Sequence, residues 1–334
     1  MRQEDDPVMS GRGMPVLVTG ASGFIGSHVV LRLIEEGVLV RAMLRDESLA
    51  SIFPKSEYLE IVVADLFDVD SLRKAVDGCE DVIHCAAALY VGAKDVKRMV
   101  IEPSVVGVQN LCRVMDNVKR VVHTSSVAAI RPSNFENGSI FSRENWCDDA
   151  SESRNPYGFA KAKAEKIVIE WAQNRDVRLV TIHPSIVFGP ILHKKHLNGS
   201  MGYMKHYAKG PPFVLDIHIN FVDVRDVAAA HVAALEKGVN LERYIVHKKG
   251  LWMKEIGSIL RSLLHRKYAR RKLPKLFAYI LAIFHPKLSL NQLRESLGAY
   301  VGYDVEDSFT TLKLPDYDIE DTLVDSINSI KAQD

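Results

Sequence analysis

Residues 19–26 have the sequence Thr19-Gly20-Ala21-Ser22-Gly23-Phe24-Ile25-Gly26, and this stretch is the clearest indicator of the fold class. An apolar run over residues 16–18 ends directly before it, and helical spacing of apolar residues runs from residue 24 to residue 36. Glycines at such a turn let the backbone approach phosphate oxygens, and the following helix points its positive N-terminal end at an anion. The stretch therefore predicts a dinucleotide-binding turn; the alternative is a strand, turn and helix without a ligand.

Apolar runs alternate with helical spacing along the rest of the first 250 residues. Further strands are predicted over residues 38–44, 61–64, 82–85, 120–124, 177–182 and 244–246. Further helices are predicted over residues 69–76, 96–117, 157–174 and 224–236. This alternation predicts the α/β class, with a doubly wound parallel sheet of the Rossmann type. Gly20, Asp65, Ala86 and Ser125 follow strands and so lie at the carboxyl edge, where such sheets bind ligands.

The domain organisation follows from where this pattern breaks. Residues 14–186 are predicted to form the dinucleotide-binding domain, to which residues 221–247 return. The pattern becomes irregular past Pro184, so residues 187–220 and 248–330 are predicted to form a smaller substrate-binding lobe. Residues 1–13 are polar and contain glycine, which predicts a disordered leader without signal-peptide character.

The composition limits the classes of partner. The chain has 334 residues, of which 47% are hydrophobic and 25% charged, and its net charge is +1. No overall field favours nucleic acid or an anionic membrane, and no apolar run reaches the roughly 20 residues of a membrane span. The four cysteines lack Cys-x-x-Cys spacing, which indicates buried thiols of a reducing compartment and a cytoplasmic location.

Tyr157 and Lys161 lie four residues apart on a predicted helix, so their side chains share one face. A phenol, with an ordinary pKa of about 10, works near neutral pH only if a neighbour stabilises its anion. We expect the Lys161 ammonium to lower the pKa of Tyr157. Ser126 is the preferred hydrogen-bond partner of the substrate oxygen, with Ser125 as the alternative. An exposed, inert Tyr–Lys pair is the other interpretation of the spacing.

Arg45 ends the second predicted strand, 19 residues after Gly26. An acidic residue there would bind a ribose 2′-hydroxyl, whereas an arginine accepts a 2′-phosphate. Arg45 therefore favours NADP, bound as NADPH, and the adjacent Asp46 keeps NAD as the alternative. A solvated surface arginine is the competing interpretation, and Arg41 is a second, less favoured candidate.

Three other clusters receive structural interpretations. His193-Lys194-Lys195-His196 is predicted to be a solvated loop and no metal site. Asp223 and Asp226 flank the start of a helix and are predicted to cap it. The basic and apolar segment 261–284 suggests a partly buried amphipathic helix, with a membrane contact or an apolar substrate entrance as alternatives.

Taken together, the motifs resemble the extended short-chain dehydrogenase/reductase family, in the superfamily of NAD-dependent epimerases and dehydratases. Within it they are similar to dihydroflavonol-4-reductase-like aldehyde and ketone reductases. The matching stretches run in family order through residues 19–26, 40–46, 64–66, 84–87, 124–126, 157–165, 183–190 and 221–227.

The resemblance implies a catalytic trio of Ser126, Tyr157 and Lys161. It also implies a cofactor site made of Gly20, Gly23, Phe24, Ile25, Gly26, Arg45, Asp65, Leu66, Ala86, Ala87, Tyr157, Lys161, Pro184 and Val187. A homodimer through the helices at 96–117 and 157–174 is implied as well. Two departures are Ser104, where many members carry Asn, and residues 127–130, which lack the Asn that holds a flavonoid ring.

The predicted function is NADP-dependent hydride transfer between nicotinamide and a small-molecule carbonyl or alcohol substrate. A sugar-nucleotide epimerase or dehydratase, and a 3β-hydroxysteroid-type dehydrogenase, are alternatives on the same fold. A protein that senses NADP without catalysis is a third, disfavoured because Tyr157 and Lys161 are both present.

Overall fold

The computed structural model describes residues 13–86, 95–210, 212–265, 271–284, 296–305 and 307–333, with residues 268 and 293. Almost all of the predicted leader therefore lies outside the described residues, and so does Ala87 of the predicted cofactor site.

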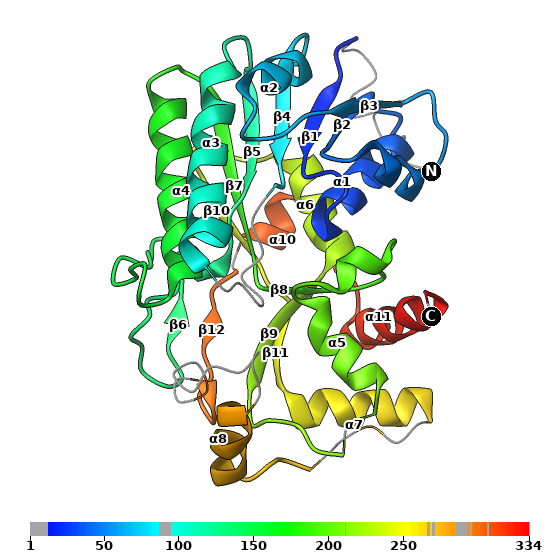
Figure 1. Cartoon of the computed structure of the whole chain (residues 1–334), viewed down its shortest axis with the longest axis vertical. Helices are drawn as coiled ribbons and strands as arrows, with labels where there is room; N and C mark the ends of the chain where they lie inside the picture. The colour runs from blue at the N-terminus through cyan, green and yellow to red at the C-terminus, as the bar shows by residue number, and fades with distance from the viewer. Residues whose placement is uncertain are drawn as a thin grey trace.

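Seven parallel strands form the main sheet, in the order β10-β7-β5-β4-β1-β2-β3 (Figure 1). They are β1 (Val16–Thr19), β2 (Val40–Leu44), β3 (Leu59–Val63), β4 (Asp81–His84), β5 (Arg120–Thr124), β7 (Arg178–Pro184) and β10 (Arg243–Val246). Strands β1, β4 and β10 are buried along their whole length, as expected where helices cover both faces. The predicted doubly wound sheet is confirmed, and the strand order reverses direction between β1 and β4, where such sheets bind ligands.

Helices cover the sheet on both faces (Figure 1). One face carries α2 (Val69–Val76), α3 (Glu102–Val114) and α4 (Pro156–Gln173), while α1 (Phe24–Glu35) and α6 (Val224–Ala234) pair on the other. The helix predicted over 96–117 differs in detail, because Lys97–Ile101 is a π-helical turn and α3 ends at Val114. The apolar sides of α3 and α4, including Val108, Leu111 and Val168, are buried within the monomer.

The second lobe is more regular than its sequence predicts. A three-stranded sheet contains β8 (Ile186–Phe188), β9 (His218–Asp223) and β11 (Lys249–Trp252), in the order β11-β9-β8. Helices α5 (Met201–Ala208), α7 (Met253–Leu264) and α11 (Ile319–Ala332) pack around a core that includes Tyr207 and Phe221. The prediction of irregular structure after Pro184 was wrong for β8 and β9. These are short strands between turns that contain glycine and proline.

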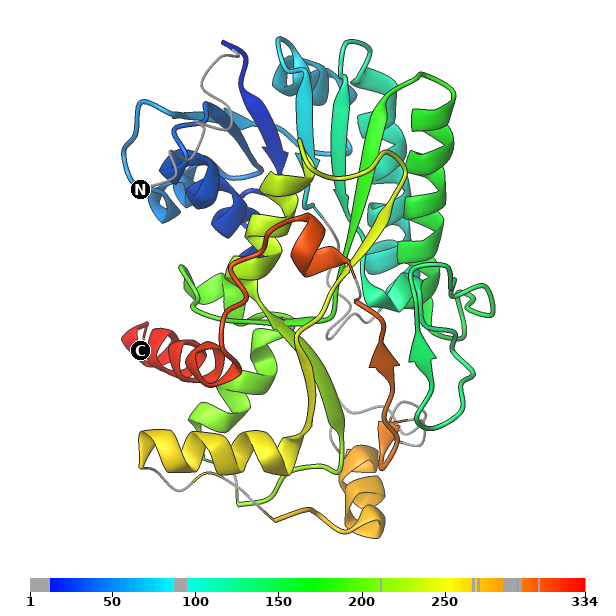
Figure 2. The ribbon, with the colours of Figure 1, turned by 180° about the vertical axis from the view of Figure 1, so that it is seen from behind.

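Shorter elements complete the chain: β6 (Ile140–Phe141) with β12 (Gly302–Tyr303), α8 (Lys275–Phe284), α10 (Ser308–Thr311) and the 3-10 turns η1 (Glu47–Ile52), η3 (Val127–Ala129) and η4 (Lys194–Leu197). The second lobe lies beyond the carboxyl ends of the main strands, and Figure 2 shows α11 beside α5 and α7 from behind. The two lobes therefore meet at the edge where the predicted site residues lie.

Candidate active site and cofactor site

Gly20 brings the end of β1 close to the end of β4. It has a φ of +67°, and a Cβ atom there would lie 2.6 Å from the backbone nitrogen and Cα of Ala86. Both the left-handed conformation and the close approach therefore require glycine at this position. The turn after β1 and the segment after β4 therefore lie on either side of the point where the strand order reverses.

Gly23 and Gly26 shape the start of α1. A Cβ atom on Gly26 would lie 2.3 Å from the carbonyl oxygen of Gly20, so the helix packs directly on the turn. A Cβ atom on Gly23 would lie 3.1 Å from the Gly20 carbonyl oxygen, and no described side chain caps the helix there. The first turn, with half-buried Phe24 and Ile25, contains no acidic residue. These features fit a dinucleotide pyrophosphate, whose charge the helix N-terminus stabilises.

Arg45 and Asp46 follow β2, and both are exposed. Asp46 caps η1 by accepting a hydrogen bond from the Ser48 amide at 2.9 Å, so one of its oxygens has a structural use. Arg41 is engaged elsewhere, donating to Glu60 at 2.9 Å and to the carbonyl oxygen of Ala75 at 3.0 Å. Of the two predicted arginines, Arg45 therefore remains the candidate for binding a 2′-phosphate, and this role stays a prediction.

The predicted adenine neighbours follow β3. Asp65 accepts a hydrogen bond from the Phe67 amide at 2.9 Å, which fixes the loop. The carbonyl oxygen of Leu66 accepts from Asn110 at 2.9 Å, and the Leu66 side chain packs against Gly107. Both residues therefore lie at the same sheet edge as the glycine turn.

Ser126 and Tyr157 come together from β5 and α4. The Ser126 hydroxyl group lies close enough to the phenol to act on its pKa, and it accepts a hydrogen bond from the Ala128 amide at 3.1 Å. Ser125 points elsewhere: its hydroxyl group donates to Glu165 at 2.5 Å in the buried core. Of the two serines, Ser126 is the one beside the tyrosine.

Asn155 and Gly158 position Tyr157. Asn155 adopts a left-handed conformation (φ 52°) and caps α4 by accepting from the Gly158 amide at 3.1 Å. A Cβ atom on Gly158 would lie 2.8 Å from the carbonyl oxygen of Ala128, so the start of α4 rests against η3. The absence of a side chain at Gly158 thus lets Tyr157 reach Ser126.

Lys161 is buried one helical turn after Tyr157. Its ammonium group donates to the carbonyl oxygen of Thr124 at 3.0 Å. Burial lowers the pKa of Lys161 to about 8, against the opposing effect of Glu165. Cys85, which follows β4, lies within electrostatic range of Lys161, although burial dominates and raises the pKa of its thiol to about 12. The Lys161 ammonium group therefore extends from α4 to the carboxyl end of β5.

One expectation about Tyr157 was wrong. We predicted that Lys161 lowers its pKa, but burial raises the pKa of Tyr157, with the nearby Ser126 hydroxyl group acting in the opposite direction. The physical reason is that the Lys161 ammonium is directed at the Thr124 carbonyl oxygen, and the half-buried phenol is partly shielded from water. A protonated phenol suits the role of proton donor.

Glu165 lies under the trio, and its network was not predicted from sequence. It is fully buried and accepts hydrogen bonds from His183 at 2.9 Å and from Arg243 at 2.7 Å, besides that from Ser125. Burial alone would raise its pKa, but His183 and Arg243 hold the pKa of Glu165 below its ordinary value. Its spacing of four residues from Lys161 was the available signal, because it places both on one helix face.

Pro184 ends β7, and Val187 is a buried residue of β8, paired with Val222 of β9. Asp223 caps α6 through the Arg225 amide, as predicted. Asp226 instead accepts from the amides of Asp316 and Tyr317, which ties the C-terminal segment to α6.

The prediction that residues 193–196 form a solvated loop was wrong. His196 is buried and donates from Nε2 to the carbonyl oxygen of Ser22 at 3.1 Å. Lys195 Nζ donates to the Ser22 hydroxyl oxygen at 2.9 Å. The second lobe folds this loop onto the glycine turn, a contact between segments about 170 residues apart that no local pattern indicates.

Within the segment 261–284, α8 has an exposed apolar surface. Leu276, Phe277, Ile280 and Leu281 are exposed there, whereas Ala278 is buried. In the part of the chain that the structure describes, no helix has both the length and the apolar character needed to cross a membrane.

Comparison with known families matches residues 16–246 to the NAD dependent epimerase/dehydratase family. This chain belongs to that family. It is 33% identical over 260 residues to cinnamoyl-CoA reductase 1 of Petunia hybrida, covering 74% of this chain and 77% of that one. It is 28% identical over 324 residues to a bifunctional dihydroflavonol 4-reductase/flavanone 4-reductase of Malus domestica, covering 90% of each.

Solved structures agree with this assignment. Yeast methylglyoxal/isovaleraldehyde reductase Gre2, complexed with NADPH, superposes with a TM-score of 0.78 at 25% identity, covering 96% of this chain and 100% of that one. The predicted resemblance to extended short-chain dehydrogenases/reductases, and the assignment as an oxidoreductase of this family, are therefore confirmed.

Proposed function

We propose that this protein is an NADPH-dependent carbonyl reductase that uses Ser126, Tyr157 and Lys161. The observation that carries the proposal is the position of the Ser126 hydroxyl group beside the Tyr157 phenol, with the buried Lys161 ammonium one helical turn away at the end of β5. NADPH, when bound, supplies the hydride. Related proteins named as reductases of cinnamoyl-CoA, dihydroflavonols, methylglyoxal and isovaleraldehyde support a reducible carbonyl as the substrate group.

The residues divide the remaining work among them. Ser126 orients the carbonyl oxygen by donating a hydrogen bond to it. Tyr157, kept protonated by burial, donates its proton to the oxygen as negative charge develops there. Lys161 holds positive charge next to the reaction, and it would bind the nicotinamide ribose. Arg45 supplies the charge that selects NADPH over NADH.

The test is consumption of NADPH by the purified protein with a panel of carbonyl compounds that includes cinnamoyl-CoA, a dihydroflavonol, methylglyoxal and isovaleraldehyde. Tyr157→Phe should lower kcat by about 10²–10⁴-fold while the Kd for NADPH stays close to that of the wild type, because the ring remains and only the hydroxyl group that donates the proton is lost. A Tyr157→Phe protein with near-normal turnover on the best substrate would refute the assignment.

A further inference from the structure

Lys195 reaches across the interface between the lobes to the cofactor turn. It lies in η4 of the second lobe, yet its ammonium group donates to the hydroxyl group of Ser22, between Gly20 and Gly23, at 2.9 Å. Lys195 is half-buried, while its neighbour Lys194 is exposed. A flexible, strongly hydrated side chain is thus held over the turn that faces the cofactor phosphates.

His196 anchors the same loop. Its Nε2 atom donates to the Ser22 carbonyl oxygen at 3.1 Å, and its Nδ1 atom accepts from the Leu192 amide at 3.4 Å. Burial lowers the pKa of His196 to about 4, so the ring is neutral and keeps both bonds at physiological pH. The ring also contacts Phe24 at a centroid distance of 5.7 Å. Lys195 therefore approaches the turn from a fixed backbone.

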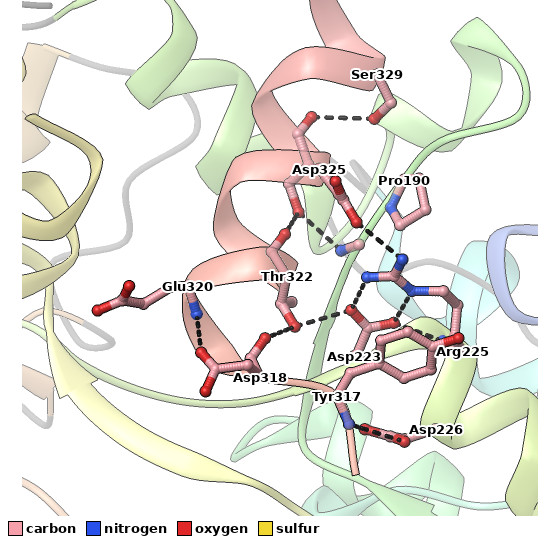
Figure 3. A network of polar contacts seen from close by, with 12 residues as sticks. Pro190, Asp223, Arg225, Asp226, Tyr317, Asp318, Glu320, Thr322, Asp325 and Ser329 are labelled. Atoms are coloured by element: carbon pink, nitrogen blue, oxygen red, sulfur yellow. Dashed lines mark hydrogen bonds and ion pairs between the residues drawn. The ribbon is translucent and has the colours of Figure 1, made fainter. Parts of the chain in front are cut away.

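The C-terminal helix fixes the other end of this loop. Ser326 and Ser329 of α11 accept hydrogen bonds from the amides of Gly189 at 2.8 Å and Ile191 at 2.9 Å. Figure 3 shows Thr322 and Asp325 of the same helix directed at Asp223 and Arg225. The loop from residue 189 to residue 196 is consequently held at both ends.

The charged groups around Lys195 indicate the kind of ligand that it would bind. Burial lowers the pKa of Lys195, and Arg45 lowers it further while Asp46 opposes the effect, so all three groups lie within electrostatic range. The sequence from Arg45 to Lys55 contains no other lysine or arginine. A phosphate monoester carries about −1.5 to −2 charges near neutral pH, which one guanidinium group does not balance. Lys195 and Arg45 lie within electrostatic range of each other, and together they supply two positive charges, which match the charge of the phosphate.

We propose that Lys195 is a second cationic ligand of the NADPH 2′-phosphate, opposite Arg45, and hence a cofactor-specificity residue supplied by the second lobe. The inference rests on the NADPH preference in the proposed function. Binding of NADPH would transfer the ammonium from the Ser22 hydroxyl group to the phosphate, with Ser22 remaining beside it.

Cofactor binding without substrate tests the inference, so that its outcome is independent of the catalytic assignment. The Kd values for NADPH, NADH, 2′,5′-ADP and 5′-AMP are measured by calorimetry for wild type, Lys195→Ala, Arg45→Ala and the double variant. Lys194→Ala is the matched control, because Lys194 is the exposed neighbour. Melting temperatures of the free proteins show whether each variant is folded.

Lys195→Ala should raise the Kd for NADPH and for 2′,5′-ADP about tenfold, equivalent to about 1.4 kcal/mol. The Kd for NADH and the Kd for 5′-AMP should stay unchanged. Lys195→Arg should retain most of the preference for NADPH over NADH. The double variant should lose less than the sum of the single losses, because the two cations share one phosphate. Equal weakening of NADPH and NADH, no weakening of either, or an equal effect of Lys194→Ala would overturn the inference.

Discussion

Ser125 donates a hydrogen bond from its hydroxyl group to the buried carboxylate of Glu165 at 2.5 Å, and this contact gives the two adjacent serines different surroundings. Glu165 also binds His183 and Arg243, so Ser125 belongs to a network in the core beneath the site. Ser126, one residue further, lies against Tyr157. Alternation along the end of β5 thus directs one hydroxyl group into the core and the other toward the site.

The two serines should respond differently to removal of the hydroxyl group. Ser126→Ala should lower kcat by about 10²–10³-fold, as expected for a lost donor to the developing oxyanion, with little change in melting temperature. Ser125→Ala should leave kcat near the wild-type value and destabilise the fold by about 1–3 kcal/mol, because Glu165 loses a buried partner. Steady-state kinetics and denaturant unfolding measure both. The reverse pattern would assign catalysis to Ser125.

The pH profile of reduction should report the protonation of Lys161. Burial lowers the pKa of this lysine to about 8, so its positive charge is present below about pH 8 and is lost above it. Because burial raises the pKa of Tyr157, the phenol remains protonated through the same range. We expect kcat/KM for reduction to be level below about pH 8 and to fall above it.

Glu165 provides the check on that assignment. Its carboxylate raises the pKa of Lys161 against the effect of burial, so Glu165→Gln should move the alkaline limb to lower pH. Glu170→Gln, an exposed change on the same helix, is the control and should leave the limb in place. If the alkaline limb of the pH profile does not move in the Glu165→Gln variant, the limb reports the titration of a group other than Lys161.

The oligomeric state is a third prediction. Following the family resemblance, we expect two copies to pair through the outer sides of α3 and α4, where Phe159 and Ile167 are partly exposed. Most apolar side chains of these helices are already buried in the monomer, which leaves a modest apolar surface for the contact. Light scattering over a concentration series should give twice the monomer mass of 37.4 kDa. A single 37.4 kDa species at all concentrations would contradict the dimer.

Local sequence patterns predicted what depends on local geometry. The glycine turn, the strand ends and the shared face of Tyr157 and Lys161 each follow from periodicity or from backbone requirements over a few residues. The helix Val69–Val76 and the strand Arg120–Thr124 have the predicted bounds.

What could not be predicted depends on contacts between distant segments. Strands β8 and β9 pair with each other across about thirty residues, so neither is evident from its own short sequence. Lys195 was interpreted as solvated because Ser22, its partner, comes from the other lobe. The raised pKa of Tyr157 likewise depends on burial, which the four-residue spacing to Lys161 does not reveal.

Gly158→Ala should uncouple Tyr157 from Ser126 without touching either residue. The new methyl group would lie 2.6 Å from the Asn155 side-chain nitrogen and 2.8 Å from the Ala128 carbonyl oxygen, and the latter is backbone that has little freedom to move. Relief requires α4 to shift away from η3, which lengthens the contact between the phenol and Ser126.

We expect Gly158→Ala to lower kcat by about 10²-fold, the size of effect that a displacement of about 1 Å produces. Overpacking should cost about 1–3 kcal/mol of stability, more than the gain of about 0.5–1 kcal/mol from replacing a helical glycine. Gly202→Ala in α5 is the matched control, because the nearest atom to its new methyl group is the Leu197 oxygen at 3.8 Å. That variant should be stabilised slightly and keep full turnover. If Gly158→Ala behaves like Gly202→Ala in both kinetics and unfolding, the packing of α4 against η3 does not set the position of the tyrosine.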